Sequence, residues 1–258
     1  MAVAVDAQGR YGALLEENYK TSVPVFNEDI VISLSVTNEK KEAEVKVSSV
    51  GDDVARYFYF SAKTSASSWT RMLGGSRVTA EEYMAVNHDS YIISNTDDTP
   101  FVDGCILLKD LEIGAEYVVV VMAQGNDGRV SRAYMTTFTP KMDLGNFVYR
   151  TGQTADLWRA SCPSVTFGTC TSENEFYIIN WAVTPAEGMT AYAVCTHPNS
   201  MTGYEEPEDM AVRVYNLGKE VVPGKMELLM YGDKENLVYV VWCDENGNYY
   251  EPYSVSVP

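Results

Sequence analysis

The sequence predicts an all-β protein made of two tandem β-sandwiches, each with a long insert that carries a short helix. Three observations predict this class: a strand–turn–strand pattern recurs at a fixed interval, short apolar segments alternate with polar or glycine-containing turns, and helical periodicity is nearly absent. The signatures of a parallel sheet are also missing, because no glycine-rich phosphate-binding loop follows a strand and strands do not alternate with helices.

The recurring pattern is an apolar strand, an Asp/Asn/Gly turn and a second strand. Its three copies contain Gly9, Gly128 and Gly247, a spacing of 119 residues in both steps. Asn, Asp and Gly tolerate the positive φ angles that tight hairpins require. Each copy is therefore predicted to be a β-hairpin that returns once per domain.

Other segments between the two complete copies match in the same order. The matching pairs are 37–39 with 171–173, 45–47 with 179–181, 57–59 with 192–194, and 82–86 with 208–212. Pro24 and Pro140 each follow the second strand of a hairpin, where a strand is expected to stop. These prolines divide the chain into domains 25–140 and 141–258.

Residues 1–24 contain the first hairpin without the rest of its domain. A lone hairpin is marginally stable in water. We therefore predict that 1–24 is the C-terminal hairpin of a truncated preceding domain. The alternative is a hairpin that is not part of a preceding domain and that packs on the next domain.

Seven strands with turn residues between them are expected in the first full domain. Their predicted ranges are 30–37, 43–49, 56–62, 91–94, 105–108, 116–123 and 130–139. The segments after the third strand of each domain, 63–104 and 197–225, each contain a helix signal. Thr79 to Glu82 reads as a capping box, and Pro207 is suited to the first position of a helix.

Residues 111–123, Leu-Glu-Ile-Gly-Ala-Glu-Tyr-Val-Val-Val-Val-Met-Ala, resemble the fibronectin type III pattern L-x-P-G-x-x-Y-x-V-x-V-x-A, with Ile113 in place of proline. This resemblance covers most of 25–140. It implies a fibronectin-III-like, immunoglobulin-like sandwich in which Tyr117 anchors the corner before the sixth strand. In 141–258, Trp181 matches the family's buried second-strand tryptophan, whereas Leu237 and Cys243 are taken to stand at the tyrosine and alanine positions.

The acidic, tyrosine-rich tandem arrangement is similar to fibronectin-III-like surface proteins and lipoproteins of Bacteroidetes-type bacteria. That resemblance implies export, an extracellular or cell-surface location, and no catalysis. No signal peptide is visible in the chain, so a signal or lipid anchor would lie outside it.

Alternation along the sixth strand predicts two opposite faces. If Tyr117, Val119, Val121 and Ala123 face the core, the side chains between them point outward. The predicted outward set is Phe58, Phe60, Val118, Val120 and Met122 in the first domain, and Ala193, Cys195, Val238, Val240 and Trp242 in the second. An apolar face of this size needs cover. We expect the inserts to fold over it as a third layer; a partner protein is the alternative cover.

The charge balance excludes several partners. The chain has 258 residues, 36 acidic and 19 basic, for a formal net charge of −17. Proteins that bind nucleic acids or anionic membrane surfaces need an excess of basic over acidic residues. The longest apolar run, 117–123, is too short to span a bilayer, so no transmembrane segment is expected.

No catalytic or metal site is assigned. Cys195 and His197 place a thiol near an imidazole, but no orienting acid is identifiable. The two histidines do not have the spacing of zinc ligands. The acidic groups at 97–103 and 205–209 lack the spacing of a calcium loop, although a structural Ca²⁺ is left open. No cofactor is expected.

The five cysteines show no CxxC pair. Cys162 and Cys170 are near enough in sequence for a small disulfide, and the alternative is that they are small buried apolar residues.

Four aromatic residues outside the predicted core strands are candidate ligand-binding rings. They are Trp69, Tyr83, Trp158 and Tyr204. Exposed rings could stack on sugars or contact a protein, and the alternative is that they pack the inserts onto the sheets. The favoured interpretation is a non-catalytic spacer and interaction module with protein or glycan partners, next to a preceding domain of the same polypeptide. The alternatives are a carbohydrate-binding module and accessory domains of a surface hydrolase.

Overall fold

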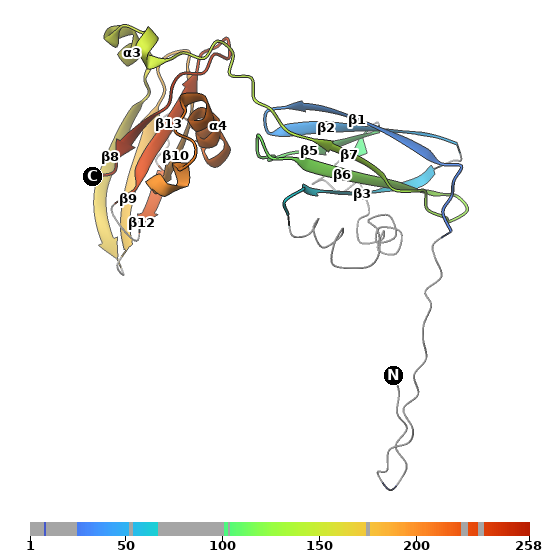
Figure 1. Ribbon diagram of the computed structural model, residues 1–258. Helices are drawn as coiled ribbons and strands as arrows, with labels where there is room; N and C mark the ends of the chain where they lie inside the picture. Colours follow the sequence, from blue (N-terminus) through green and yellow to red (C-terminus); the bar gives the residue numbers. More distant parts are fainter. Residues whose placement is uncertain are drawn as a thin grey trace. The chain divides into compact units, whose positions relative to one another are not determined.

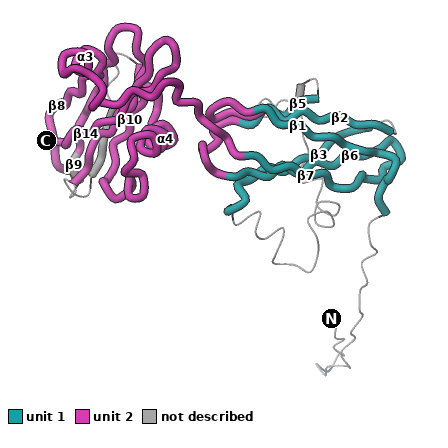
Figure 2. The backbone as a smooth tube through the Cα atoms, turned by 45° about the horizontal axis from the view of Figure 1, so that its top comes forward, with its two compact units in different colours: residues 1–37, 44–108, 116–138 teal, residues 38–43, 109–115, 139–258 magenta. Residues whose placement is uncertain are grey.

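The computed structural model describes residues 8, 25–51, 54–66, 101–102, 104–173, 176–222, 227–231 and 235–258. The chain divides into two compact units (Figure 2). Unit 1 comprises residues 1–37, 44–108 and 116–138, and unit 2 comprises 38–43, 109–115 and 139–258. The predicted hairpin in 1–24 lies almost wholly outside the described residues. Among those that are described, no helix has the length and apolarity needed to cross a bilayer.

The described strands of the first half form two hydrogen-bonded sheets (Figure 1). They are β1 (Val31–Glu39), β2 (Glu42–Val50), β3 (Val54–Lys63), β4 (Phe101–Val102), β5 (Cys105–Leu108), β6 (Tyr117–Gly125) and β7 (Tyr134–Phe138). One sheet has the order β1-β2-β5-β4 and the other β3-β6-β7. This order is that of a constant-type immunoglobulin sandwich, with the fourth strand on the sheet of the first.

The second half repeats this plan with one change. Its strands are β8 (Ser164–Glu173), β9 (Phe176–Thr184), β10 (Thr190–Thr196), β11 (Lys219–Glu220), β12 (Glu227–Tyr231), β13 (Leu237–Cys243) and β14 (Tyr253–Ser256). Its helices are η2 (Arg150–Gly152), α3 (Ala155–Ser161), η3 (Pro198–Met201) and α4 (Pro207–Leu217). The sheet orders are β12-β9-β8 and β11-β10-β13-β14, so the fourth strand now joins the other sheet. Both halves are all-β sandwiches, and the predicted fold class is confirmed.

Side-chain alternation in the first sandwich is as predicted. Tyr57 pairs across strands with Ala123, so these residues share a face of the β3-β6-β7 sheet. The Tyr57 hydroxyl lies 2.7 Å from Ser49 Oγ on β2, which places this face toward the opposite sheet. Tyr117 is buried there, with its ring stacked on Phe138 at a centroid distance of 5.8 Å.

The opposite face of that sheet is apolar as well. Phe58, Val118, Val120 and Met122 form one cluster and are at most 1% exposed. The predicted covering segment 63–104, with its capping box, lies largely outside the described residues. The third layer over this face therefore stays a prediction.

In the second sandwich the predicted faces of β13 are wrong. Val238, Val240 and Trp242 pack with Trp181 of β9 in the core between the two sheets, instead of pointing outward. Trp181 is 6% exposed, as its predicted match to a buried tryptophan requires. A shift of one residue moves every side chain of a strand to the other face.

The third layer itself is present in the second sandwich. α4 begins at Pro207, as predicted, and lies against β10 and β13 (Figure 1). Its Ala211 and Val214 are fully buried in one cluster with Tyr239 and Val241 of β13. The predicted helix-bearing insert after the third strand is thus confirmed. It covers the outward face of the β10-β13 sheet, as expected, but that face carries Tyr239 and Val241 instead of Val238 and Val240.

A tyrosine joins the two sheets at the same place in each sandwich. The hydroxyl of Tyr134, the first residue of β7, donates to the carbonyl of Ile30 just before β1, at 3.3 Å. Tyr253, the first residue of β14, donates in the same way to Pro163 just before β8. Burial raises the pKa of Tyr253, which keeps its hydroxyl protonated as a donor.

Removing this hydroxyl should destabilise the second sandwich. We expect Tyr253→Phe to lower its free energy of unfolding by about 1 kcal/mol, because one part-buried hydrogen bond is lost and the Pro163 carbonyl loses the hydroxyl that donates to it. Urea denaturation followed by tryptophan fluorescence measures the change. Tyr204→Phe is the matched control, since Tyr204 makes its described contact through its ring; an equal loss in both variants would contradict the role of the Tyr253 bond.

Candidate functional site

Trp158, a predicted ligand-binding ring, is part of the core. It lies on α3, which begins after Thr154, whose Oγ1 accepts a hydrogen bond from the Leu157 amide. Its ring meets Trp242 edge to face at a centroid distance of 5.2 Å, and its side chain is only 7% exposed. The expectation of an exposed ring at Trp158 is therefore wrong. The short helix turns the indole onto the end of the inter-sheet core.

Tyr204 is the other predicted ring that the structure describes. It is half-buried, and the Arg213 guanidinium lies over its face at 4.9 Å. Arg213 Nε also donates to the Ser200 carbonyl at 3.3 Å, which holds the guanidinium in place. Trp69 and Tyr83 lie outside the described residues. The binding role assigned to these three residues stays a prediction.

Tyr149 is an exposed ring that the sequence analysis did not select. It is 42% exposed, meets Phe147 edge to face at 5.0 Å, and donates its hydroxyl to Glu208 in the first turn of α4. Residues i and i+2 of an extended segment point to the same side. The Phe-x-Tyr spacing was therefore the available signal for this pair.

The Cys195–His197 segment has a structural explanation. Cys195 packs against the inter-sheet core cluster. His197 Nδ1 accepts the Asn199 amide at 3.2 Å, which caps η3, and its Nε2 lies 3.4 Å from a Glu235 carboxylate oxygen. The imidazole is thereby committed to holding the turn after β10.

All five cysteines are free thiols, so Cys162 and Cys170 do not form the small disulfide that was left open. Cys162 ends α3, and Cys170 follows an irregularity in β8 at which the pairing with β9 shifts. Burial raises the pKa of the Cys162 and Cys243 thiols. At neutral pH these two are therefore mostly protonated and poorly nucleophilic.

The acidic residues that precede and begin α4 are engaged locally. Glu205 Oε1 accepts the Gly203 amide at 2.8 Å, and this hydrogen bond lowers the pKa of the Glu205 carboxyl. Glu208 accepts the Tyr149 hydroxyl. Within the described ranges, no group of three or more His, Cys, Asp or Glu side chains is placed to hold a metal ion. A structural Ca²⁺ stays an untested possibility of the sequence.

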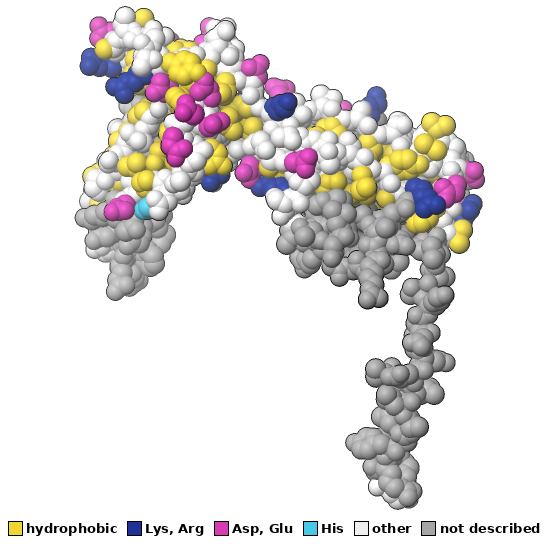
Figure 3. Space-filling model, in the orientation of Figure 1, with side chains coloured by type: hydrophobic (Ala, Val, Ile, Leu, Met, Phe, Trp, Pro, Cys, Tyr) yellow, Lys and Arg dark blue, Asp and Glu magenta, His cyan; other side chains and the backbone are white. Residues whose placement is uncertain are grey.

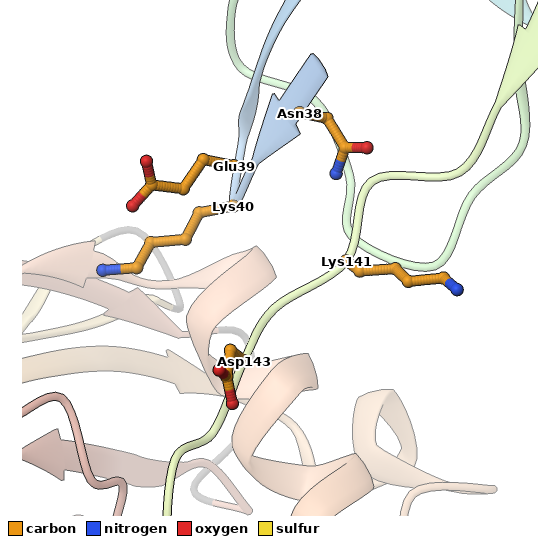
Figure 4. Close-up of a pocket in the computed structure, with 5 residues that line it drawn as sticks. All are labelled: Asn38, Glu39, Lys40, Lys141 and Asp143. Atoms are coloured by element: carbon orange, nitrogen blue, oxygen red, sulfur yellow. The ribbon is translucent and has the colours of Figure 1, made fainter. Parts of the chain in front are cut away.

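A surface pocket of about 340 Å³ in unit 2 is lined by Asn38, Glu39, Lys40, Lys141 and Asp143. Figure 4 shows that Lys141 points away from Lys40 and Glu39, so the lining charges do not converge on one point. Ligand pockets depend on a few polar groups that converge to fix a ligand's orientation. This pocket therefore gives no basis for assigning a ligand.

The chain passes through the first sandwich from one end to the other. It arrives beside the β6–β7 hairpin, where the Asn27 amide donates to Val130 at 2.7 Å. It leaves at the opposite end of β6, where Phe138 of β7 pairs with Tyr117. At about 3.4 Å per residue, the nine residues of β6 separate these ends by about 27 Å.

The second sandwich is traversed in the same sense. The incoming segment lies against the residues that follow the β13–β14 turn, where the Tyr249 amide donates to the Leu144 carbonyl at 3.0 Å. The outgoing strand β14 runs to the far end, where Ser256 pairs with Leu237, the first residue of β13. In each sandwich the chain therefore enters at one end and leaves at the other.

The thiols should differ in reactivity. With 5,5′-dithiobis(2-nitrobenzoic acid) at pH 7.5, we expect exposed Cys170 to react first and buried Cys243 to react only as the protein opens, because burial raises the pKa of Cys243 and blocks access to it. Cys170→Ser should remove the fast phase and Cys243→Ser a slow one. A fast phase that persists in Cys170→Ser would contradict this assignment.

Comparisons with known proteins do not place the chain in a family. No family model matches, and no curated protein matches. The solved structures that match include the central fibronectin-III array of RIM-binding protein (10% identity, 90% of this chain, 63% of that chain, TM-score 0.26). They also include fibronectin(III)-like modules of Clostridium thermocellum CbhA (12% identity, 88% of this chain, 91% of that one, TM-score 0.27). The chain thus spans about 63% of the RIM-binding protein array. The strand orders above show two immunoglobulin-like β-sandwiches, independently of these matches.

Proposed function

We propose that this chain is a non-catalytic spacer and interaction segment of a larger extracellular or cell-surface protein. The observation that carries the proposal is the passage of the chain through each sandwich. In both, the polypeptide arrives beside the hairpin formed by the last two strands and leaves at the opposite end. Domains traversed in this way lengthen a protein as they are added, which suits a module that holds another domain or a ligand away from its anchor.

The surface chemistry supports an extracellular role. Figure 3 shows acidic side chains distributed over the visible face among apolar and uncharged ones. The net charge of −17 favours solubility and opposes self-association. The tandem, acidic and tyrosine-rich style resembles surface proteins and lipoproteins of Bacteroidetes-type bacteria, and an anchor on a neighbouring segment is part of this proposal.

A carbohydrate-binding module is the second candidate, and Tyr149 favours it. Its partly exposed ring lies beside the Glu208 carboxylate, which is the combination of an aromatic surface and a hydroxyl acceptor that a sugar can use. Tyr204 is the second described ring of this kind, although Arg213 covers one of its faces. Accessory domains of a surface hydrolase are a third candidate, for which the same two contacts would serve substrate capture.

Labelling of intact cells tests the proposed location. In the native host, a membrane-impermeant biotin reagent should label lysines of the chain, such as Lys46 and Lys109, without lysis, because both extracellular and surface locations expose them. A cytoplasmic protein followed in the same sample is the control. Labelling only after lysis would overturn the extracellular proposal.

A glycan array separates the spacer from the carbohydrate-binding module. The spacer proposal expects no glycan signal above that of Tyr149→Ala and Tyr204→Ala, because a spacer needs no sugar site, Trp158 packs in the core and Arg213 covers one face of Tyr204. A glycan that binds the unaltered protein and loses at least about tenfold in affinity in Tyr149→Ala, which corresponds to about 1.4 kcal/mol, would favour the second candidate. Tyr134→Phe, which changes a residue of unit 1 while both rings belong to unit 2, serves as the folding control.

A further inference from the structure

Most edge strands of the described sheets are protected against pairing with another chain. The edge of a sheet exposes amide and carbonyl groups that can bind a further strand, and short length, charged side chains and irregularities prevent this. β4, β7, β11, β12 and β14 are only two to five residues long. β3 contains Arg56 and Lys63 as well as an irregularity after Val54, and β8 has an irregularity between Phe167 and Cys170.

β1 is the exception among the edge strands that the structure describes. It is nine residues long, and residues 30–38 include no charged residue, proline or glycine. Its side chains alternate without a break between more and less exposed from Val31 to Glu39, as in a regular strand. On one side β1 pairs with β2, and no strand of the described part of the chain pairs with its other side (Figure 1). β1 therefore offers a long, regular and uncharged template for another strand.

The two faces of β1 specify what a pairing strand must carry. Ile32 is 3% exposed, whereas Leu34 and Val36, which share its face, are only partly buried. A strand added beside β1 would cover these two side chains. The opposite face carries exposed hydroxyl side chains, on Ser33, Ser35 and Thr37. The pairing strand needs apolar residues on one face and small polar residues on the other.

A second copy of β1 meets this requirement. When two copies run antiparallel with Ser35 opposite Ser35, each Leu34 lies opposite Val36 and each Ser33 lies opposite Thr37. Directly opposite residues share a face of the sheet, so apolar side chains meet apolar ones and hydroxyls meet hydroxyls. All nine residues of β1 take part in this register. The pairing is two-fold symmetric and uses the edge of both copies, so it closes at a dimer.

The charges of the chain determine when this contact forms. The net charge of −17 on each copy opposes association. No charged residue lies within 30–38, so the repulsion comes from acidic residues farther from the contact. Salt shortens the reach of such charges, to about 8 Å at physiological ionic strength. The dimer should therefore become stronger as the salt concentration rises.

We propose that β1 is a self-pairing edge, through which two copies of this chain join antiparallel into one continuous sheet. The pairing itself goes beyond the spacer role and does not depend on the cellular location. Its biological meaning rests on the spacer role, because a paired spacer presents two copies of whatever it carries and so makes their binding bivalent.

Sedimentation equilibrium of the full chain in the presence of a reductant tests the pairing. We expect a monomer–dimer equilibrium that shifts toward the dimer between about 0.05 M and about 0.5 M NaCl. Ser35→Lys should raise the dissociation constant at least about tenfold, because the two lysines would face each other across the symmetry axis. Ser48→Lys is the matched control: Ser48 is exposed on the interior strand β2, so the variant has the same charge change away from the edge and should alter the constant less than about twofold.

Cysteine cross-linking tests the register. The background variant is Cys170→Ser, which removes the exposed native thiol. Oxidation should link Ser35→Cys chains to each other, because the Cα atoms of directly opposite residues lie within the range of a disulfide. Ser33→Cys and Thr37→Cys chains should link when mixed but not separately. Thr166→Cys, at an exposed position of the irregular edge strand β8, is the control and should not link.

Four results would overturn the self-pairing edge. They are a chain that stays monomeric at about 100 µM in high salt, species larger than a dimer, an equal weakening by Ser35→Lys and Ser48→Lys, and no cross-link in Ser35→Cys. Failure of the cell-surface labelling alone would remove the spacer role while leaving the dimer intact, so the two proposals fail separately.

Discussion

The constraint on which both sandwiches depend is a central strand that is apolar on both faces. β6 and β13 are buried almost from end to end, and their alternate side chains point to opposite sides of the sheet. Burying a Val side chain stabilises the fold by about 1.5–3 kcal/mol, so leaving either face in water would cost a large part of the stability of a small domain. One face meets the opposite sheet. The other demands an additional layer, which explains why the chain after β10 returns as α4 instead of forming a short loop.

Local sequence patterns were enough to predict the tight turns and the start of the helix. Gly128 and Gly247 both have positive φ, at +80° and +78°, as their predicted place in tight turns requires. Pro207 begins α4 because proline fixes a helical φ and lacks the amide that the first turn cannot use. These features depend on a few neighbouring residues, so they can be predicted without knowing what packs around them.

The faces of β13 were missed for a reason that the sequence itself contained. Placing Leu237 at the Tyr117 position uses a spacing of 120 residues, whereas the turn glycines are 119 apart. With 119, Val238, Val240 and Trp242 fall on Val119, Val121 and Ala123, which face the inter-sheet core. An apolar strand gives no alternation to correct such an error, because every position along it is hydrophobic. Only the turn spacing carries the information.

The aromatic residues could not be sorted by position alone. Trp158 lies outside the strands, yet α3 turns it into the core, and Tyr253 lies on an edge strand, yet it bonds across to the start of the other sheet. Both outcomes depend on contacts between residues more than 80 positions apart, which no local pattern reports.

The repeat does report one of these long-range contacts. Tyr134 and Tyr253 are separated by the same 119 residues as the turn glycines, and each donates to the residue before the first strand of its sandwich. A cross-sheet bond that recurs at the repeat spacing fixes how the last strand lies against the first. It thereby sets the direction in which the chain leaves, opposite to the hairpin beside which it arrived. The end-to-end passage of the polypeptide is thus built into each copy by the hairpin turn at one end and this tyrosine at the edge, and duplication of the unit repeats it.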